Sequence, residues 1–282
     1  MQQIIIDETN KDIRKQMGHI AIYCVNYKSY DALYNYIASV ASAMDAAEMP
    51  VNVSLFIADN TDKDFLPIKS SHETIKIQVF PFHKNLGYFP AIHKMMEQVK
   101  PQQFDYVIVS NVDVLLDKDF LLRLTSYEAK EDLGWIAPQI YSKLEERDRN
   151  PKIMQRYPKR KLQVLQTLFR CPPLYNLYTH TAYKSKKLIK HPAGEIYAGH
   201  GSFIILTRRF FHKCPVIDYP VFLFCEEIYL GEQCRQYGLK VRYEPTLRVT
   251  DAEHASTGTF KRSKYCRHNL EAVSYILKTY YV

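Results

Sequence analysis

Short apolar runs alternate with amphipathic runs through the first half of this chain of 282 residues. Four of these segments have the length and apolar content of buried strands: 19–25, 51–59, 75–82 and 104–111. Three others have apolar residues at helical spacing: 29–47, 87–100 and 117–132. Alternation of this kind gives a mostly parallel central sheet with helices on both faces, so we expect an α/β fold.

The second half of the chain is less regular. A basic stretch with several prolines contains a predicted helix at 161–169, and a turn, a strand and a helix start follow over 195–211. We expect a further helix from about Glu226 to Gly238, because a glycine commonly ends a helix. Two short strands, "KVRYEP" and "LRVTDAEH", and a basic amphipathic closing helix complete the pattern.

The composition is that of an ordinary soluble globular protein, with 46% hydrophobic and 24% charged residues. A run of about 18 apolar residues, which a membrane-spanning helix would need, is absent from the sequence. The first residues have too short an apolar run and too many acids for a signal peptide. The six cysteines have no paired spacing, so we expect a cytoplasmic protein with reduced cysteines and no zinc site.

The positive charge is concentrated in one segment. Residues 149–194 contain eleven Lys or Arg and no Asp or Glu, and subtracting these eleven from the total of 38 leaves 27 bases against 30 acids. A local anionic partner is therefore expected rather than a generally basic protein. The segment could contact the inner face of an anionic membrane, bind nucleic acid, or be a solvated insertion or subunit contact. Nucleic acid is the weakest of these, because no recognised binding motif is present.

Polar segments follow each predicted strand of the first half: "NYKS" (26–29), "DNTD" (59–62), "KNLGY" (84–88) and "SNVDV" (110–114). Ligands of parallel α/β sheets bind at the carboxyl ends of the strands. Loops are commonly polar, so one such segment means little, but four at one edge of a sheet indicate a binding site. In the last segment, Asn111 and Asp113 are expected on one face of an extended chain.

Further candidate residues lie in the second half. Glu226 and Glu227 follow an apolar run at a predicted helix start, where acids either compensate the helix dipole or act as a general base. His254 follows an extended segment. A lone His is more often structural, but with Asp113 it could complete an oxygen-and-nitrogen site for Mg²⁺ or Mn²⁺.

The chain resembles the family 2 glycosyltransferases of the GT-A fold. The resemblance is carried by these segments, in this order along the sequence: "VNYKS", "ADN", "KNLGY", "SNVDV", "YAGHGSFII", "FLFCEEIYLGEQCRQYG", "YEP" and a late His. The chain is most similar to the bacterial branch that includes rhamnosyltransferases and other enzymes of surface-polysaccharide assembly. The resemblance runs from about residue 19 to the C-terminus. It implies one GT-A domain over 19–282 after an N-terminal extension of 1–18. A nucleotide-binding half would be 19–115, and an acceptor-binding half, with the basic segment 149–194, would be 116–282.

The resemblance also implies a divalent ion, Mn²⁺ or Mg²⁺, bound by Asp113 and His254. Asn111 stands where the family has the first acid of its D-x-D motif and would bond the nucleotide sugar instead. Asp59 would contact the nucleotide base and recognise it. Other residues expected to bind the nucleotide sugar are Asn26, Tyr27, Asn85, Gly87, Gly199, His200 and Gly201.

The implied reaction is an inverting transfer from a nucleoside-diphosphate sugar to a hydroxyl of a glycan or a lipid-diphosphate-linked acceptor. Glu227 would be the base, although relatives have Asp there, and Glu226 is the alternative. A retaining transferase and a catalytically inactive nucleotide-sugar-binding or scaffold protein of the same pathway remain open. A nucleotidyltransferase would show a Gly-rich basic loop early in the chain, which "VNYKSYD" does not provide. We expect a cytoplasmic protein at the inner face of the cell membrane.

Overall fold

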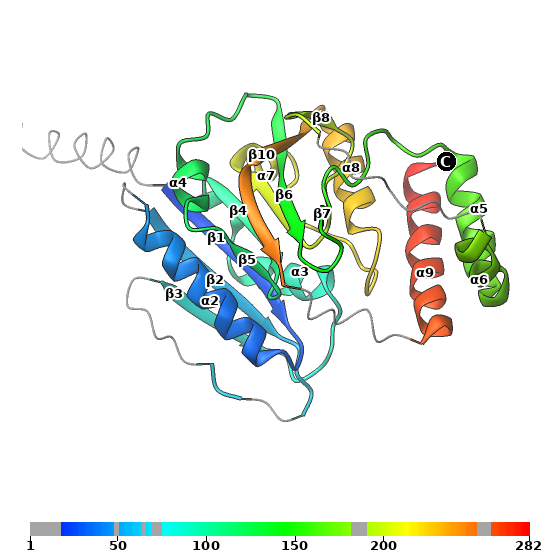
Figure 1. The fold of residues 1–282 in the computed structure, drawn as a ribbon, viewed down its shortest axis with the longest axis horizontal. Coiled ribbons are helices and arrows are strands. Elements are labelled where there is room, and N and C mark those ends of the chain that lie inside the picture. The colour runs from blue at the N-terminus through cyan, green and yellow to red at the C-terminus, as the bar shows by residue number, and fades with distance from the viewer. Residues whose placement is uncertain (1–17, 48–50, 64–65, 69–74, 182–190, 253–260) are drawn as a thin grey trace, which may run out of the picture.

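The computed structural model describes residues 18–47, 51–63, 66–68, 75–181, 191–252 and 261–282. Its centre is one sheet with the strand order β3-β2-β1-β4-β9-β6-β10-β5, with β7 paired to β6 and β8 paired to β10 (Figure 1). The strands are β1 (Gly18–Asn26), β2 (Val51–Asp59), β3 (Lys76–Pro81), β4 (Tyr106–Asn111), β5 (Val114–Leu116), β6 (Leu133–Ser142), β7 (Arg147–Asp148), β8 (Gly194–Ile196), β9 (Phe203–Thr207) and β10 (Lys240–Asp251).

Helices pack on both faces of this sheet and beside it. They are α2 (Tyr30–Asp45), α3 (Phe89–Gln98), α4 (Phe120–Thr125), α5 (Lys159–Arg170), α6 (Pro172–Thr181), α7 (Arg208–Lys213), α8 (Glu226–Gln236) and α9 (Arg262–Tyr280), with a short 3₁₀ turn η1 (Pro101–Gln103). The predicted α/β class is confirmed. Within the described residues, none of the helices has both the length and the apolar character needed to cross a bilayer.

The first four strands in space, β3, β2, β1 and β4, are all parallel. Their register aligns Asn26 with Asp59 and Val25 with Asn111, so the strands end at the same edge. The predicted convergence of polar loops is therefore present in the structure. It follows from parallel pairing, which brings equivalent ends of neighbouring strands together.

The second half makes the sheet mixed, because β9 runs antiparallel to both β4 and β6. The chain reaches β9 from a turn at the carboxyl edge, where the first residue of β9, Phe203, pairs with Ser110 near the end of β4. A strand that starts at that edge must run back through the sheet. The mostly parallel arrangement expected from the sequence thus describes β1 to β4, whereas β5, β7, β8 and β9 all pair antiparallel with their neighbours.

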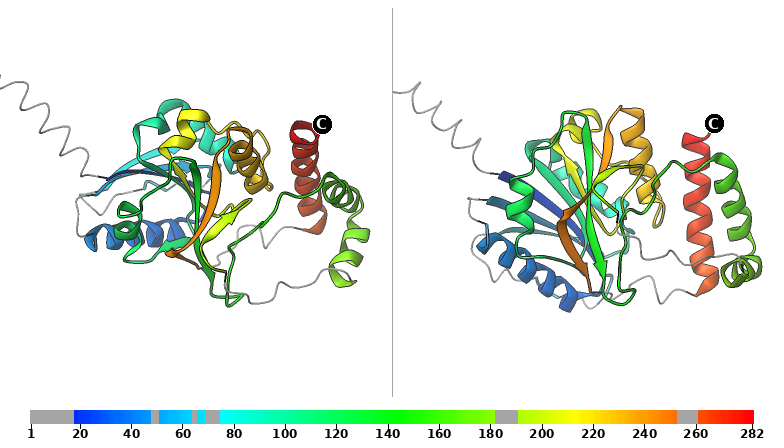
Figure 2. Two further views of the ribbon diagram at one scale, coloured as in Figure 1. Left: turned by 90° about the horizontal axis from the view of Figure 1, so that it is seen from above. Right: turned by 45° about the horizontal axis from the view of Figure 1, so that its top comes forward.

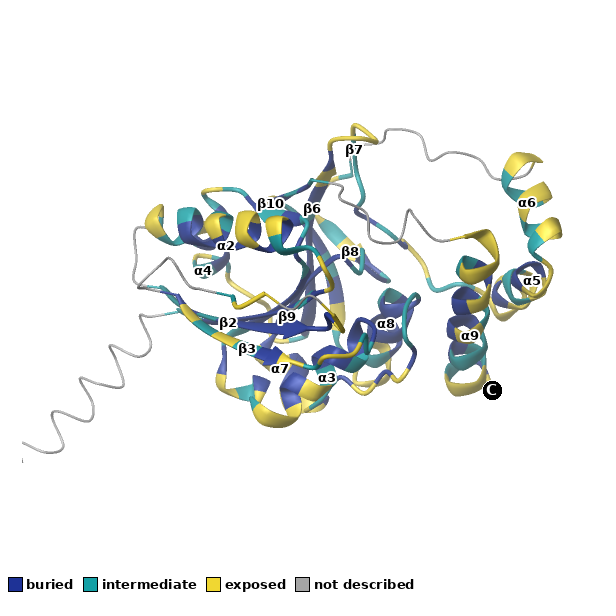
Figure 3. Cartoon of the chain, turned by 90° about the horizontal axis from the view of Figure 1, so that it is seen from below, coloured by how far each residue is buried: buried dark blue, intermediate teal, exposed yellow. Residues whose placement is uncertain are grey.

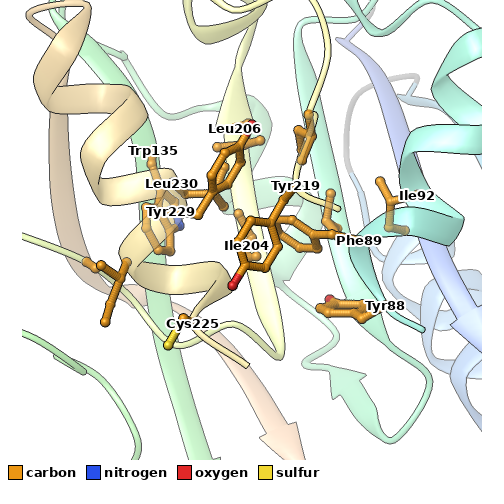
Figure 4. Packing of buried hydrophobic residues seen from close by; sticks show 14 of the residues in the cluster. Tyr88, Phe89, Ile92, Trp135, Ile204, Leu206, Tyr219, Cys225, Tyr229 and Leu230 are labelled. Carbon is orange, nitrogen blue, oxygen red and sulfur yellow. The ribbon is translucent and has the colours of Figure 1, made fainter. Parts of the chain in front are cut away.

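The two faces of the sheet contribute to separate apolar clusters. Along β1, Ile20 and Ile22 face α2 and α4, whereas Ala21 and Tyr23 face the side covered by α3, α7 and α8, as the two-residue period of a strand requires. Figure 4 shows part of the second cluster, in which Phe89 of α3 packs edge-on against Tyr219 and Tyr229. All these side chains are buried.

The helices α5, α6 and α9 form a group beside the sheet, which we call the helical lobe (Figure 2). Glu232 of α8 connects the helical lobe to the rest of the fold through Arg156. Its fully buried carboxylate is 2.6 Å from Nε of Arg156 and accepts a 2.7 Å hydrogen bond from Tyr197, and Arg156 also donates to the carbonyl of Tyr280 near the end of α9. Burial acts to raise the pKa of Glu232, but these partners and Arg235 outweigh it and hold the pKa below its usual value.

Three sequence predictions of element boundaries need correction. The helix expected over 117–132 is only α4, because the polar residues after Thr125 do not continue its buried apolar face. The basic stretch contains α6 as well as α5. The two short strands predicted after α8 are one strand, β10, with an irregularity between Glu244 and Arg248. The six cysteines are free, as expected.

Candidate active site

A cleft of about 1440 Å³ runs along the carboxyl ends of the central strands and continues between the sheet and the helical lobe. Nine of the predicted site residues line it: Tyr27, Asn85, Gly87, Asn111, Asp113, His200, Gly201, Glu226 and Glu227. Asn26, Asp59 and Gly199 are not among its lining residues. His254 lies outside the described residues. Side chains from both halves of the chain therefore share one cleft.

Asp59 lies behind the cleft wall. It is fully buried, and its carboxylate accepts hydrogen bonds from Nδ2 of Asn26 (3.3 Å), from the hydroxyl of Tyr30 (2.9 Å) and from the backbone N–H of Thr61 (3.0 Å). The carboxylate thus connects the end of β2 to the end of β1 and to the start of α2. On this side, the cleft is lined by the following residue, Asn60.

The turn at 85–87 depends on its glycine. Gly87 has a φ of +88°, and a Cβ at this position would lie 2.3 Å from the carbonyl oxygen of Phe222. The Asn85 side chain accepts from the Gly87 N–H (3.0 Å), Asn60 donates to the Gly87 carbonyl (2.9 Å), and the Tyr88 N–H donates to the Phe222 carbonyl (3.0 Å). This turn therefore joins the loop after β3 to the segment that leads into α8.

Asn111 and Asp113 line the same cleft but do not belong to one extended segment. The chain turns after Asn111, and β5 then pairs antiparallel with β10. The Asn111 N–H donates to the Ser202 carbonyl (2.9 Å), and the Ala252 N–H donates to the Asp113 carbonyl (2.9 Å). The expectation of a single extended face is wrong because the pairing of β5 with β10 requires the chain to turn. The turn places Asp113 beside the end of β10.

The donor atoms around Asp113 suit a hard cation. Its carboxylate is an oxygen donor of the type that such an ion prefers, and nearby Asp251 is paired with Arg149 at 2.5 Å. Within the described ranges, no group of three or more His, Cys, Asp or Glu side chains is arranged to hold a metal ion. In nucleotide sites, Mg²⁺ is commonly bound by one or two protein carboxylates together with phosphate oxygens of the substrate. The described residues fit an ion of that kind.

The turn before β9 brings the two sides of the cleft together. The His200 N–H donates to Oδ1 of Asn150 (2.7 Å), and the hydroxyl of Tyr88 donates to the Gly201 carbonyl (3.1 Å). A Cβ at Gly201 would lie 3.6 Å from Oε2 of Glu227, so the turn passes directly beside that carboxylate. Gly199 has a packing role, because a Cβ there would lie 2.6 Å from Cβ of Ala137.

The start of α8 is a tight turn. Phe224 and Cys225 have φ values of 75° and 62°, a left-handed conformation that costs a non-glycine residue about 1–2 kcal/mol. The Phe224 N–H donates to Oε1 of Glu226 (2.9 Å). Burial, together with the charge of Glu227, raises the pKa of Glu226 to about 8. Both glutamates line the cleft, and Glu227 is the less buried of the two. Backbone strain of this kind is often found where side chains must be held for function.

Several cleft residues were not singled out from the sequence, although Tyr88 and Ser202 lie within the segments "KNLGY" and "YAGHGSFII". Tyr88, Asn150, Ser202 and Asp251 each contribute to the arrangement through contacts with segments far away in the chain. Asn150 follows an acidic turn, and Asp251 lies three residues before His254, the candidate metal ligand. Strand pairing, the turn before β9 and the start of α3 bring these four residues to the cleft.

Comparisons with known proteins agree on one family. The family model described as "Glycosyltransferase like family 2" matches residues 18–268. The chain is 26% identical over 271 residues to N-acetylglucosaminyl-diphospho-decaprenol L-rhamnosyltransferase from two strains of Mycobacterium tuberculosis, CDC 1551 / Oshkosh and ATCC 25618 / H37Rv. The alignments cover 89% of this chain and 81% of the relatives. The crystal structure of S. aureus TarS 1–349 aligns with a TM-score of 0.51 at 8% identity, over 93% of this chain and 72% of that one, which supports the fold alone.

Proposed function

The chain belongs to the glycosyltransferase-like family 2, and from this premise we propose that it is a metal-dependent, inverting transferase. It moves a sugar from a nucleoside-diphosphate sugar to a hydroxyl group of a glycan or lipid-linked acceptor. The observation that carries the proposal is the turn at 200–202, which lies beside Glu227 and is bonded to Asn111 at the end of β4. A donor at the strand ends and a base at the helix start thus share one cleft.

The donor is assigned to the side of the cleft formed by the loops after β1, β2 and β3. Tyr27, Asn60 and Asn85 line this side. Asn60 is almost fully buried and its amide donates to the Gly87 carbonyl (2.9 Å), so it supports the wall of the cleft on this side. Asp59 acts indirectly, by holding the loops in place. When bound at Asp113, a divalent ion would offset the negative charge of the donor's phosphates.

Glu227 is assigned as the general base. In the reaction, its carboxylate accepts the proton of the acceptor hydroxyl while that oxygen bonds to the anomeric carbon. The bond between this carbon and the phosphate oxygen breaks, and the nucleoside diphosphate leaves with the electron pair. One displacement of this kind inverts the anomeric configuration. Glu226 positions the start of α8, because it is buried and accepts from the Phe224 N–H.

The acceptor class follows from the relatives. Their name describes a transferase of L-rhamnose that acts on N-acetylglucosaminyl-diphospho-decaprenol. We infer that this chain also acts in the assembly of a bacterial surface polysaccharide such as an O-antigen or capsule. A lipid-linked acceptor would place the enzyme in the cytoplasm, at the inner face of the membrane. Residues 19–115 and 116–282 would be its nucleotide-binding and acceptor-binding halves, after an extension of residues 1–18.

The test is a transfer assay. UDP-, dTDP- and GDP-sugars are offered with phytanyl-diphosphate-linked N-acetylglucosamine, and the released nucleoside diphosphate is measured. Glu227→Gln should lower the rate by a factor of about 10²–10⁴, the usual contribution of a general base. Glu195→Gln is the matched control, because Glu195 is exposed and does not line the cleft. Near-normal transfer by Glu227→Gln, or a product with retained anomeric configuration, would contradict the proposal.

A further inference from the structure

The cleft has a second arm between the sheet and the helical lobe that has no assigned role. Its lining includes Lys161 and Phe169 of α5, Tyr175 of α6, and Lys264 and Tyr265 of α9. Among the described lining residues contributed by these three helices there is no Asp or Glu. The sheet side of the same cleft, in contrast, carries the proposed metal ligand and the proposed base. The sheet side thus carries acids together with Arg147, Arg149 and Lys152, whereas the described lining of the lobe side carries bases and aromatic rings without acids.

An aromatic row connects the two sides. The ring of Phe224, two residues before Glu226, is 5.2 Å from the ring of Tyr265. Tyr265 stacks with Tyr175 at 5.9 Å and an interplanar angle of 27°, and Tyr175 is 6.3 Å from Tyr178. The row thus starts beside the first residue of α8 and ends on α6. Aromatic faces of this kind suit apolar chains and the apolar faces of sugars.

Two lysines line the same arm of the cleft. The ammonium group of Lys161 is 3.5 Å from the centre of the Tyr157 ring, which fixes the charge at the cleft wall. Lys264 lines the cleft from the first turn of α9. Positive charges that line the same arm as an apolar wall are complementary to a ligand that joins phosphates to a hydrocarbon.

The outer end of the row reaches an apolar edge. Leu174 and Leu177, three residues apart on α6, are 42% and 59% exposed, and Val164 of α5 is 58% exposed. Figure 3 shows α6 as mainly exposed, in contrast to the mainly buried inner face of α9. Apolar side chains three positions apart share one face of a helix, so the aromatic row continues onto an apolar surface.

From this arrangement we infer that the arm binds a lipid-linked diphosphate as the acceptor. The acceptor sugar lies near Glu227, the diphosphate lies at Lys161 and Lys264, and the lipid follows the aromatic row toward Leu174 and Leu177. The inference rests on the proposed function, because it assigns a binding site in the same cleft to the acceptor proposed there. It adds the residues that distinguish this acceptor from an uncharged glycan.

Binding without catalysis tests the inference separately from the transfer reaction. Calorimetric titration of the full chain uses farnesyl diphosphate below its micelle-forming concentration, with farnesol and inorganic diphosphate as the two partial ligands. All titrations use Asp113→Ala protein without added metal, so that binding at the donor phosphates does not contribute. Farnesyl diphosphate should bind at least tenfold more tightly than either partial ligand, because each provides only one of the two interactions.

In the same background, Lys161→Ala should weaken binding of farnesyl diphosphate about tenfold, as the loss of one charge-assisted contact does. Lys161→Gln keeps most of the stem over Tyr157 and should have the same effect, which separates the charge from packing. Lys159→Ala is the matched control, an exposed lysine of the same helix turn that does not line the cleft, and should change binding less than twofold.

Equal effects of Lys159→Ala and Lys161→Ala would overturn the inference, since binding would then be non-specific attraction. Equal affinity for inorganic diphosphate would overturn it by showing a free phosphate site, and equal affinity for farnesol by showing a purely apolar one. The proposed function fails separately, when the unmodified protein transfers no sugar in the assay above. Transfer without binding of farnesyl diphosphate would reject only the lipid-linked acceptor.

Discussion

Glu226 is the residue whose protonation state the fold changes most clearly within the site. Its pKa is 4.5 in the unfolded chain and about 8 in the folded protein, because burial and the adjacent Glu227 disfavour its charged form. The folded state therefore retains a proton that the unfolded chain loses. The resulting stabilisation is complete below about pH 4.5, and it decreases as the pH rises toward 8.

Glu226→Gln should remove this pH dependence while keeping an oxygen that accepts from the Phe224 N–H. Between pH 5 and 8, the wild-type protein should lose unfolding free energy relative to the variant by up to about 1.4 kcal/mol per pH unit. Denaturant unfolding of both proteins at pH 5, 6.5 and 8 measures the difference. A difference that does not change with pH would show that Glu226 is ionised in the folded protein at neutral pH.

Gly87 allows a separate test of the turn that joins the two sides of the cleft. Gly87→Ala introduces a Cβ 2.3 Å from the Phe222 carbonyl oxygen at a φ of +88°. We expect a loss of at least about 2 kcal/mol of unfolding free energy, from left-handed strain plus the clash. Gly194→Ala is the control, because a Cβ there meets nothing within 4 Å. Equal stability of the two variants in thermal and denaturant unfolding would contradict the role of the turn.

At the scale of elements, Arg156 and Glu232 connect the helical lobe to α8. Arg156→Ala leaves the buried Glu232 carboxylate with fewer partners, and because Arg156 is 34% exposed and Tyr197 and Arg235 remain, the loss should cost about 1–3 kcal/mol. Hydrogen exchange should accelerate in α5 and near the end of α9 more than in β1. Arg235→Ala, which removes a half-exposed partner of the same carboxylate, should have a smaller effect. Similar exchange in both variants would contradict the anchoring role.

The elements also show how far the sequence determines this fold. The four parallel strands and α2, α3, α8 and α9 could be predicted, because each has its own apolar period and clear end signals. The reversed direction of β9 could not, since it depends on where the turn at 200–202 crosses the sheet. Helix α6 has no buried side chain, so the sequence contains no apolar period that could predict it.

The same distinction applies to the candidate site. Asp113, Glu226 and Glu227 could be predicted because they follow a buried strand or start a helix. The buried position of Asp59 could not, because it depends on Tyr30 and Asn26 from other elements. Asn60, one residue later, is the neighbour that lines the cleft.

At the scale of the whole molecule, four bases of the segment 149–194, Lys159, Arg160, Lys161 and Arg170, lie on α5 in the helical lobe. We expect the protein to bind vesicles that contain acidic lipid at low salt, since each base near an anionic surface contributes about 1 kcal/mol. Binding should decrease at high salt and be weak on neutral vesicles. The measurement is flotation with acidic and with neutral vesicles, each at low and at high salt. Failure to bind acidic vesicles at low salt would reject membrane contact through charge.

The central claim is that one cleft binds a nucleoside-diphosphate sugar with a divalent ion at Asp113. The most direct measurement is thermal stabilisation by UDP, GDP, dTDP and CMP, each with and without Mn²⁺. One of these nucleotides, at about 100 times its Kd, should add about 2.7 kcal/mol of stability with the metal present. The effect should be lost in Asp113→Ala. No stabilisation of the folded protein by any of the four, or equal stabilisation of Asp113→Ala, would contradict the claim.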